Sequence, residues 1–195
     1  MRALLLALTL ALPAQAQQAT MNTALPDTAF PSNFGGAYDL TDHHGNHRSQ
    51  ADPAGNVQLV FFGYATCEAI CTVALPIMSE MTAELAVRDI AVTPLVITVD
   101  PATDTVANMG PALATFAPGL TGLTGTEAEL AHVRDLFHVE RTLLFTDPRG
   151  VDVYAHGSHI FVMDGNGDFL TLLPPVLSTA RMVEIVEGYT SQNAG

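Results

Sequence analysis

The spacing of apolar residues divides the middle of the chain into alternating strands and helices. Residues 57–64 (VQLVFFGY) and 90–99 are continuous apolar runs, which predicts two buried strands. Between them, over residues 67–88, apolar residues recur at three- and four-residue steps, which predicts an amphipathic helix. Weaker patterns predict a helix, a short strand and a second helix at residues 103–116, 120–123 and 127–137.

The C-terminal third changes to short extended segments. Residues 142–146 and 152–155 are two of them, and residues 159–163 (HIFVM) and 169–173 (FLTLL) are two more. The last two flank Asp-Gly-Asn-Gly-Asp, which predicts a β-hairpin. The same five residues resemble part of a calcium loop, but the downstream glutamate is missing at the required offset, so we interpret them as a hairpin turn. An amphipathic helix over residues 178–189, with Ser178 as N-cap, closes the chain.

The first part of the domain predicts a β-hairpin. Residues 35–41 form a predicted strand, residues 42–46 a tight turn, and a partner strand follows. The complete order is then a hairpin, a βαβ unit, two further helices with a short strand between them, a second hairpin and a final helix. This order predicts an α/β protein of thioredoxin-like fold, with a central mixed sheet flanked by helices and an N-terminal β-hairpin.

The N-terminus has the form of a secretion signal. Arg2 precedes ten uncharged apolar residues, 3–12, and Ala14-Gln15-Ala16 has the small-x-small form of a cleavage site. Ten helical residues reach about 15 Å, too short for a membrane span. We therefore expect a cleavable signal peptide at residues 1–16, a flexible Pro-punctuated leader at 17–33, and the folded domain at 34–192. A bacterial type of signal places the mature protein in the periplasm, without stable membrane insertion.

Composition and charge limit the kinds of partner that we expect the protein to bind. Apolar residues make up 48% and charged residues 14%, as in a globular protein, and the formal net charge is −13 with no lysine. A surface of this charge repels nucleic acid and anionic lipid, so neither is an expected partner. It suits a cation or a basic protein, although a solvated acidic face explains it as well.

Two cysteines carry the candidate chemistry. Cys67 and Cys71 follow a predicted buried strand directly, where open α/β sheets place their sites. In a helix, positions four residues apart share one face, and the helix start favours thiolate. Thiolate is the nucleophile of disulfide exchange and a soft ligand for Cu(I). The carboxylate of Glu68 disfavours the thiolate form of the nearby cysteines but attracts a cation. A local structural disulfide is the alternative interpretation.

The chain resembles the Sco (SenC) family of copper proteins from about Phe34 to Tyr189. The residues that carry the resemblance are Phe34-Gly35-Gly36, Leu40-Thr41-Asp42, Leu59-Val60-Phe61-Phe62-Gly63-Tyr64, Cys67-x3-Cys71, Val99-Asp100-Pro101, Asp104-Thr105, Gly122-Leu123-Thr124-Gly125, His156-Gly157-Ser158, Ile160-Phe161-Val162-Met163-Asp164 and Gly167. The resemblance implies that Cys67, Cys71 and His156 bind one copper ion, as Cu(I) or Cu(II).

The resemblance also implies a function. It implies a metallochaperone that delivers copper to the binuclear copper centre of cytochrome c oxidase, with the subunit that accepts the metal, or another periplasmic copper chaperone, as partner. The alternative is a thiol–disulfide reductase that acts on the cysteines of that subunit through Cys67 and Cys71. A general thioredoxin-like oxidoreductase is less well supported, because the cysteine spacing is one residue too long and no proline precedes residues 159–163. A thiol peroxidase would need a threonine and an arginine near its cysteine. Thr66 is adjacent to Cys67, but no arginine is obviously placed for this role.

The histidines are not equivalent candidates. His156 lies eleven residues before Gly167, a separation that the family shares, and strand alternation would point His159 to the opposite face. His43, His44 and His47 form a polar cluster, which we interpret as a solvated turn, with an auxiliary metal site as the alternative. We interpret His132 and His138 as ordinary helix or edge residues.

Two features depart from the family pattern. The family usually has proline after each cysteine, whereas Glu68 and Thr72 stand here. The family also commonly carries a transmembrane anchor, where this chain has the predicted cleavable signal.

Overall fold

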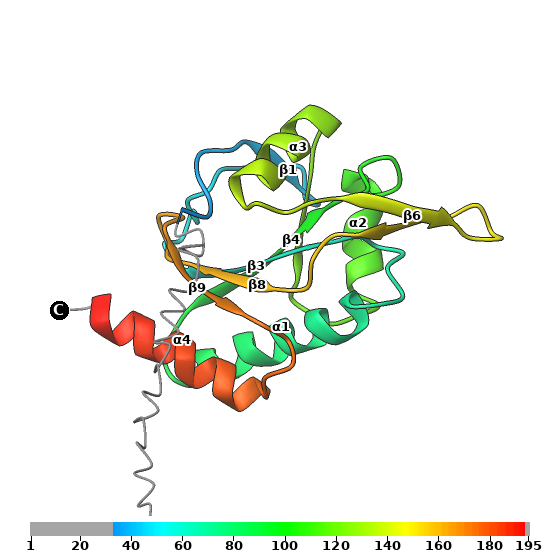
Figure 1. Ribbon diagram of the computed structural model, residues 1–195. Coiled ribbons are helices and arrows are strands. Elements are labelled where there is room, and N and C mark those ends of the chain that lie inside the picture. Colours follow the sequence, from blue (N-terminus) through cyan, green and yellow to red (C-terminus); the bar gives the residue numbers. More distant parts are fainter. Residues whose placement is uncertain (1–32, 194–195) are drawn as a thin grey trace, which may run out of the picture. The chain divides into compact units, whose positions relative to one another are not determined.

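The computed structural model describes residues 33–193, and Figure 1 shows their arrangement. The predicted signal peptide and all but the last residue of the predicted leader lie outside the described residues. In the described part of the chain, no helix combines the length and the apolar character needed to cross a membrane.

A seven-stranded mixed sheet forms the centre of the domain, with strand order β2-β1-β5-β4-β3-β8-β9. Its strands are β1 (Leu40–Asp42), β2 (His47–Arg48), β3 (Val57–Gly63), β4 (Val92–Thr98), β5 (Thr121–Thr124), β8 (Ile160–Met163) and β9 (Phe169–Leu173). The three central strands β3, β4 and β5 are parallel, and the pairs towards both edges are antiparallel. The thioredoxin-like α/β fold with an N-terminal hairpin is therefore confirmed.

Four helices cover this sheet: α1 (Cys71–Ala86), α2 (Val106–Leu113), α3 (Glu127–Leu136) and α4 (Thr179–Asn193). Helices α1 and α4 pack together on one side of the sheet, and α3 lies on the other (Figure 1). Neighbouring residues of β3 pack on opposite sides of the sheet, because successive side chains of a strand point to opposite faces. Thus Phe62 meets Phe137 at the end of α3, with 5.3 Å between ring centroids, while Phe61 meets His156 on the other face.

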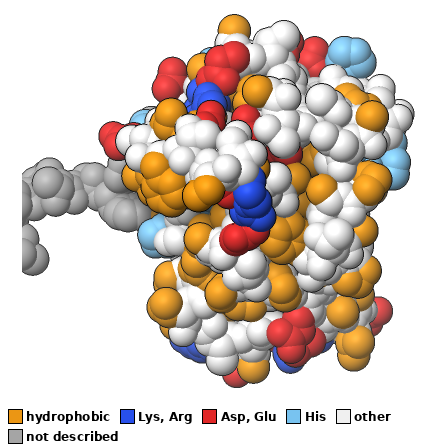
Figure 2. Space-filling view, turned by 90° about the vertical axis from the view of Figure 1, so that its right-hand side faces the viewer, with side chains coloured by type: hydrophobic (Ala, Val, Ile, Leu, Met, Phe, Trp, Pro, Cys, Tyr) orange, Lys and Arg blue, Asp and Glu red, His pale blue; other side chains and the backbone are white. Residues whose placement is uncertain are grey.

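A second, two-stranded sheet stands apart from the central one. It consists of β6 (Thr142–Thr146) and β7 (Asp152–Ala155), paired as an antiparallel hairpin that projects from the domain (Figure 1). Leu143, Leu144 and Phe145 on β6 are each more than half exposed. Figure 2 looks onto this side of the molecule, where apolar side chains are interspersed with a few charged ones.

Two predicted elements begin later in the structure than the sequence pattern indicates, for local reasons. The strand predicted over residues 35–41 is confined to Leu40–Asp42, because Gly35 and Gly36 have φ values of +88° and +144°, outside the strand region. The helix predicted over residues 67–88 begins only at Cys71. The hairpin predicted around Asp164 is confirmed: its Oδ1 accepts the backbone N–H groups of Asn166 and Asp168.

Candidate metal centre

Strand register brings the cysteines and His156 to one edge of the sheet. Cys67 lies in the turn after β3, and Cys71 is the first residue of α1. His156 lies between β7 and β8. Because β8 runs antiparallel to β3, with Val60 opposite Phe161, the segment before β8 returns to the edge where β3 ends. Two stretches of chain separated by 89 residues therefore meet there.

The turn that carries the cysteines, residues 64–70, is called here the cysteine loop. The N–H of Cys67 donates to the carbonyl of Tyr64 at 3.1 Å, which closes a tight turn directly after the strand. Ile70 is the N-cap of α1, so Cys67 itself lies outside the helix. The expectation that both sulfurs share one helical face is therefore wrong: the loop, not helical periodicity, brings them together.

The three predicted ligands form a compact buried cluster. The Sγ atom of Cys67 lies 3.8 Å from Nε2 of His156, and one donor atom from each of the three residues lies within 4.8 Å of the others. Cys67, Cys71 and His156 are only 1%, 0% and 4% exposed. Within residues 33–193 this is the one cluster of at least three His, Cys, Asp or Glu side chains with metal-binding spacing. Two soft sulfurs and one imidazole form a donor set suited to copper.

Aromatic rings hold the imidazole in place. The His156 ring makes edge-on contacts with Phe61 and Tyr64, at centroid separations of 5.9 and 5.5 Å. The Tyr64 hydroxyl in turn accepts the backbone N–H of Tyr154, at the end of β7, at 3.2 Å. Among the described residues, Nδ1 of His156 is buried without a hydrogen-bond partner. The ring is therefore oriented by packing, with Nε2 towards the sulfur of Cys67.

The two thiols differ in acidity. The neighbouring Cys71 thiol stabilises the Cys67 thiolate and lowers its pKa against the opposing effect of burial, and His156 lowers it further. The pKa of Cys71 is raised, first by the Cys67 sulfur and then by burial. Cys67 is thus the more acidic thiol of the pair, which suits both soft-metal binding and disulfide exchange.

A buried carboxylate that sequence reasoning did not single out as functional supports the cysteine loop. Asp104, fully buried, accepts the N–H of Ala65 at 3.0 Å and the hydroxyl of Thr98 at 2.7 Å. Burial raises the pKa of Asp104 to about 6, despite these two hydrogen bonds. The sequence signal was present, since Asp104 is one of the residues that carry the family resemblance, but its contact with a loop 39 residues away appears only in the structure.

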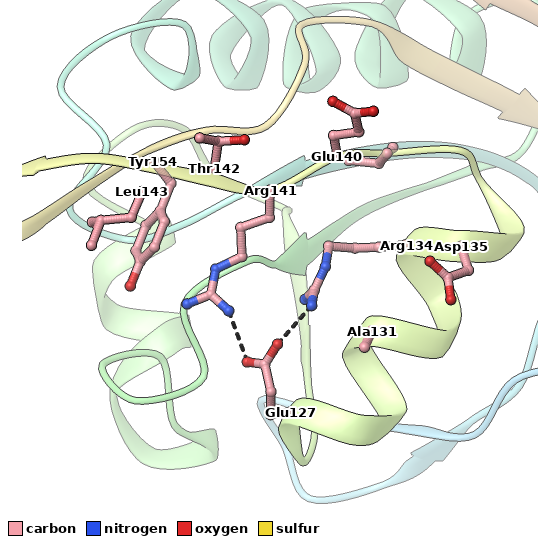
Figure 3. Close-up of a pocket in the computed structure, with 10 residues that line it drawn as sticks. Glu127, Ala131, Arg134, Asp135, Glu140, Arg141, Thr142, Leu143 and Tyr154 are labelled. Atoms are coloured by element: carbon pink, nitrogen blue, oxygen red, sulfur yellow. Dashed lines mark hydrogen bonds and ion pairs between the residues drawn. The ribbon is translucent and has the colours of Figure 1, made fainter.

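A cluster of charged side chains fixes the base of the β6–β7 hairpin (Figure 3). Glu127 accepts from Arg134 at 2.6 Å and from Arg141 at 2.9 Å. The guanidinium of Arg141 also lies over the ring of Tyr154, 4.3 Å from its centroid. The cluster thereby ties α3 to both strands of the hairpin, directly ahead of the segment that carries His156.

The other histidines have different surroundings. His159 is exposed, which agrees with the prediction that it and His156 point in different directions. His43 accepts the N–H of Gly122 through Nδ1 at 2.9 Å, so it joins the N-terminal hairpin to β5. His47 contacts Asp39 on the surface, and His132 contacts the carbonyl of Ala37.

Comparison with known proteins shows which class of protein this chain belongs to. The family model described as SCO1/SenC matches residues 26–191 of this chain. A SCO2-like protein from Rickettsia felis is 30% identical over 156 residues, which are 80% of this chain and 76% of the relative. These matches and the confirmed fold define a thioredoxin-fold protein with a Cys-Cys-His site.

Solved structures agree with this class. Bradyrhizobium japonicum ScoI with copper bound is similar at 30% identity and a TM-score of 0.71, over 80% of this chain and 99% of that one. Yeast Sco1 with copper bound gives 27% identity and a TM-score of 0.74, over 83% and 90% of the two chains. The chain belongs to the SCO1/SenC family.

Proposed function

We propose that this protein binds one copper ion through Cys67, Cys71 and His156 and delivers it to the copper-accepting subunit of cytochrome c oxidase. The observation that carries the proposal is the buried cluster of two sulfurs and an imidazole within 4.8 Å of one another. Copper-bound relatives of the same fold support it. One related protein, BsSco, is described as a member of a family of cytochrome c oxidase assembly proteins, which supports the acceptor.

A matched pair of histidine variants tests the site. Reduced wild-type protein is expected to take up one equivalent of Cu(I) in competition with a coloured chelator. His156→Ala removes one of three donors and is expected to weaken Cu(I) binding by more than about 100-fold, since even changes to outer-shell partners cost 10- to 100-fold. His159→Ala, three residues away and exposed, is the control and should bind as the wild type does. Equal affinities for the two variants would contradict the assignment of His156.

Thiol–disulfide reduction of the acceptor's cysteines is the second candidate function. The lowered pKa of Cys67 and the raised pKa of Cys71 favour it, because an attacking thiolate beside a protonated resolving thiol is what exchange requires. Copper binding needs the same dithiol form, so the two activities are compatible. If reduction is the main activity, His156→Ala keeps full turnover on an acceptor disulfide while it loses copper.

The periplasm is the proposed compartment. The sequence of residues 1–16 supports it, since a short basic start, an apolar run and a small-x-small site are typical of secretion signals. The proposed domain, residues 34–192, would follow a leader there. N-terminal sequencing of protein recovered from a periplasmic fraction tests this, with a first residue near Gln17 as the expected result.

A further inference from the structure

A small pocket is lined by Cys67 but not by Cys71 or His156. Its volume is about 190 Å³. The cysteine loop, the first turn of α1, the segment after α2 and the β6–β7 turn line it, through Ala65, Thr66, Cys67, Glu68, Thr72, Phe116, Arg149 and Val151. We call it the access pocket.

All three ligands are buried, and Cys67 is the one of the three that lines this pocket. Cys71 is fully buried beneath β3, where a Cβ on Gly63 would come within 3.0 Å of its sulfur. His156 is enclosed by aromatic rings. A ligand that arrives from solvent through the access pocket therefore meets Cys67 before it can meet either partner.

The lining of the pocket defines what fits it. Phe116 and Val151 give it apolar walls, and its volume is only about 190 Å³. That space suits one side chain better than a bulky chelator. A neutral, soft cysteine thiol matches both the apolar walls and the preference of Cu(I) for sulfur.

An exposed ion pair runs along the pocket. Arg149 in the β6–β7 turn donates to Glu68 in the cysteine loop at 3.1 Å and to Asp147 at 2.8 Å. Both Glu68 and Arg149 line the pocket. Their side chains are 76% and 65% exposed, so the contact is weak, screened by salt and easily opened.

We propose that the access pocket receives a cysteine side chain of the copper acceptor, and that the Glu68–Arg149 pair holds the pocket narrow until it is displaced. This rests on the proposed copper delivery. In the first exchange, the bond from the acceptor sulfur to copper forms, the bond from Cys67 to copper breaks, and the acceptor's thiol proton moves to the Cys67 sulfur. Copper stays monovalent throughout, so no oxidant or reductant is needed.

Filling the pocket tests its role. Val151→Phe is expected to slow Cu(I) transfer to a synthetic peptide with a Cys-x-x-x-Cys pair at least tenfold, with Cu(I) affinity unchanged within twofold. In copper-free reduced protein, alkylation of Cys67 by iodoacetamide should slow by a similar factor. Val176→Phe, at a site that is 89% exposed and outside the pocket lining, is the matched control and should change neither rate.

Neutralising the ion pair tests its role as a closure. Glu68→Gln and Arg149→Gln should each speed transfer two- to fivefold, and each should remove the acceleration that salt gives the wild type. A simple effect of charge on the sulfurs predicts opposite changes for the two variants. Glu184→Gln breaks an exposed ion pair on α4, with Arg181, and is expected to leave transfer unchanged.

The outcomes separate this inference from the proposed function. If wild-type protein binds and transfers copper while Val151→Phe transfers at the same rate, the access pocket is wrong and the proposed function stands. If Glu68→Gln and Arg149→Gln shift the rate in opposite directions, the closure is wrong. If wild-type protein takes up no Cu(I), the proposed function fails, and the alkylation rates alone decide whether the pocket controls access to Cys67.

Discussion

At the scale of single residues, the site depends on groups that lie outside the ligand set. Tyr64 places the imidazole and joins it to β7, and Asp104 holds the loop that presents Cys67. Tyr64 acts through its ring contact with His156 and the hydrogen bond from Tyr154, and Asp104 acts through the hydrogen bond from the backbone of Ala65. Because the carboxylate of Asp104 is fully buried, its ionisation is coupled to the stability of the whole domain.

Asp104 gives a pH dependence with a definite sign. Its folded pKa of about 6 lies above the usual value of 3.8 for an aspartate, so its contribution is most favourable below pH 4 and is lost as pH rises through about 6. Asp104→Asn removes that titration. The free energy of unfolding of wild type, relative to the variant, should fall by roughly 3 kcal/mol between pH 4 and pH 7.

Urea unfolding of copper-free, reduced protein at several pH values measures this difference. Asp89→Asn is the control, because Asp89 is exposed and asparagine tolerates its φ of 59°. A wild-type-minus-variant difference that is flat from pH 4 to pH 7 would show that Asp104 does not titrate in this range.

The three residues of the cluster could be predicted from the sequence, but their local geometry could not. Cys67 and Cys71 stand out by their place after a buried strand, and His156 by its spacing from Gly167 in the family pattern. Cys67 nevertheless lies outside the helix, because the turn at Tyr64 and the hydrogen bond from Ala65 to Asp104 override the helical pattern. That hydrogen bond joins segments far apart in sequence, and apolar periodicity carries no information about it.

At the scale of elements, the separate β6–β7 hairpin determines the surroundings of the site. Its turn supplies Arg149 and Val151 to the access pocket, and β7 leads directly into His156. Both of its strands are predicted at their observed bounds, residues 142–146 and 152–155, but its separation from the central sheet is not. The sequence pattern of two short strands does not indicate which sheet those strands join.

The charged cluster at the base of the hairpin gives a prediction for this element. Glu127→Gln leaves the buried guanidinium of Arg134 without its carboxylate and loosens Arg141, so it should destabilise the domain by about 1–2 kcal/mol. Protection of β6 and β7 amides from hydrogen exchange should fall more than protection of β3. Glu184→Gln, whose partner Arg181 is exposed, should cost less than about 0.5 kcal/mol. Equal losses in the two variants would contradict an anchoring role for Glu127.

At the scale of the whole molecule, the central sheet is a rigid platform for a small site at its edge. The strands β3 and β8 are buried almost throughout, so the register that joins the cysteine loop to His156 is held by the core. The whole chain carries a formal net charge of −13, which favours a basic or cationic partner. Fold and site together fit a protein that holds a soft metal ion in a buried cluster and releases it by ligand exchange.

Copper binding by the cluster is tested by uptake of Cu(I) by the fully reduced protein, compared with Cys67→Ser/Cys71→Ser. One tightly bound equivalent is expected for the wild type and none for the double variant, whose fold should persist because serine is close in size to cysteine. Unfolding in urea confirms that the variant is folded. Equal, weak uptake by both proteins would contradict the claim that this cluster binds copper.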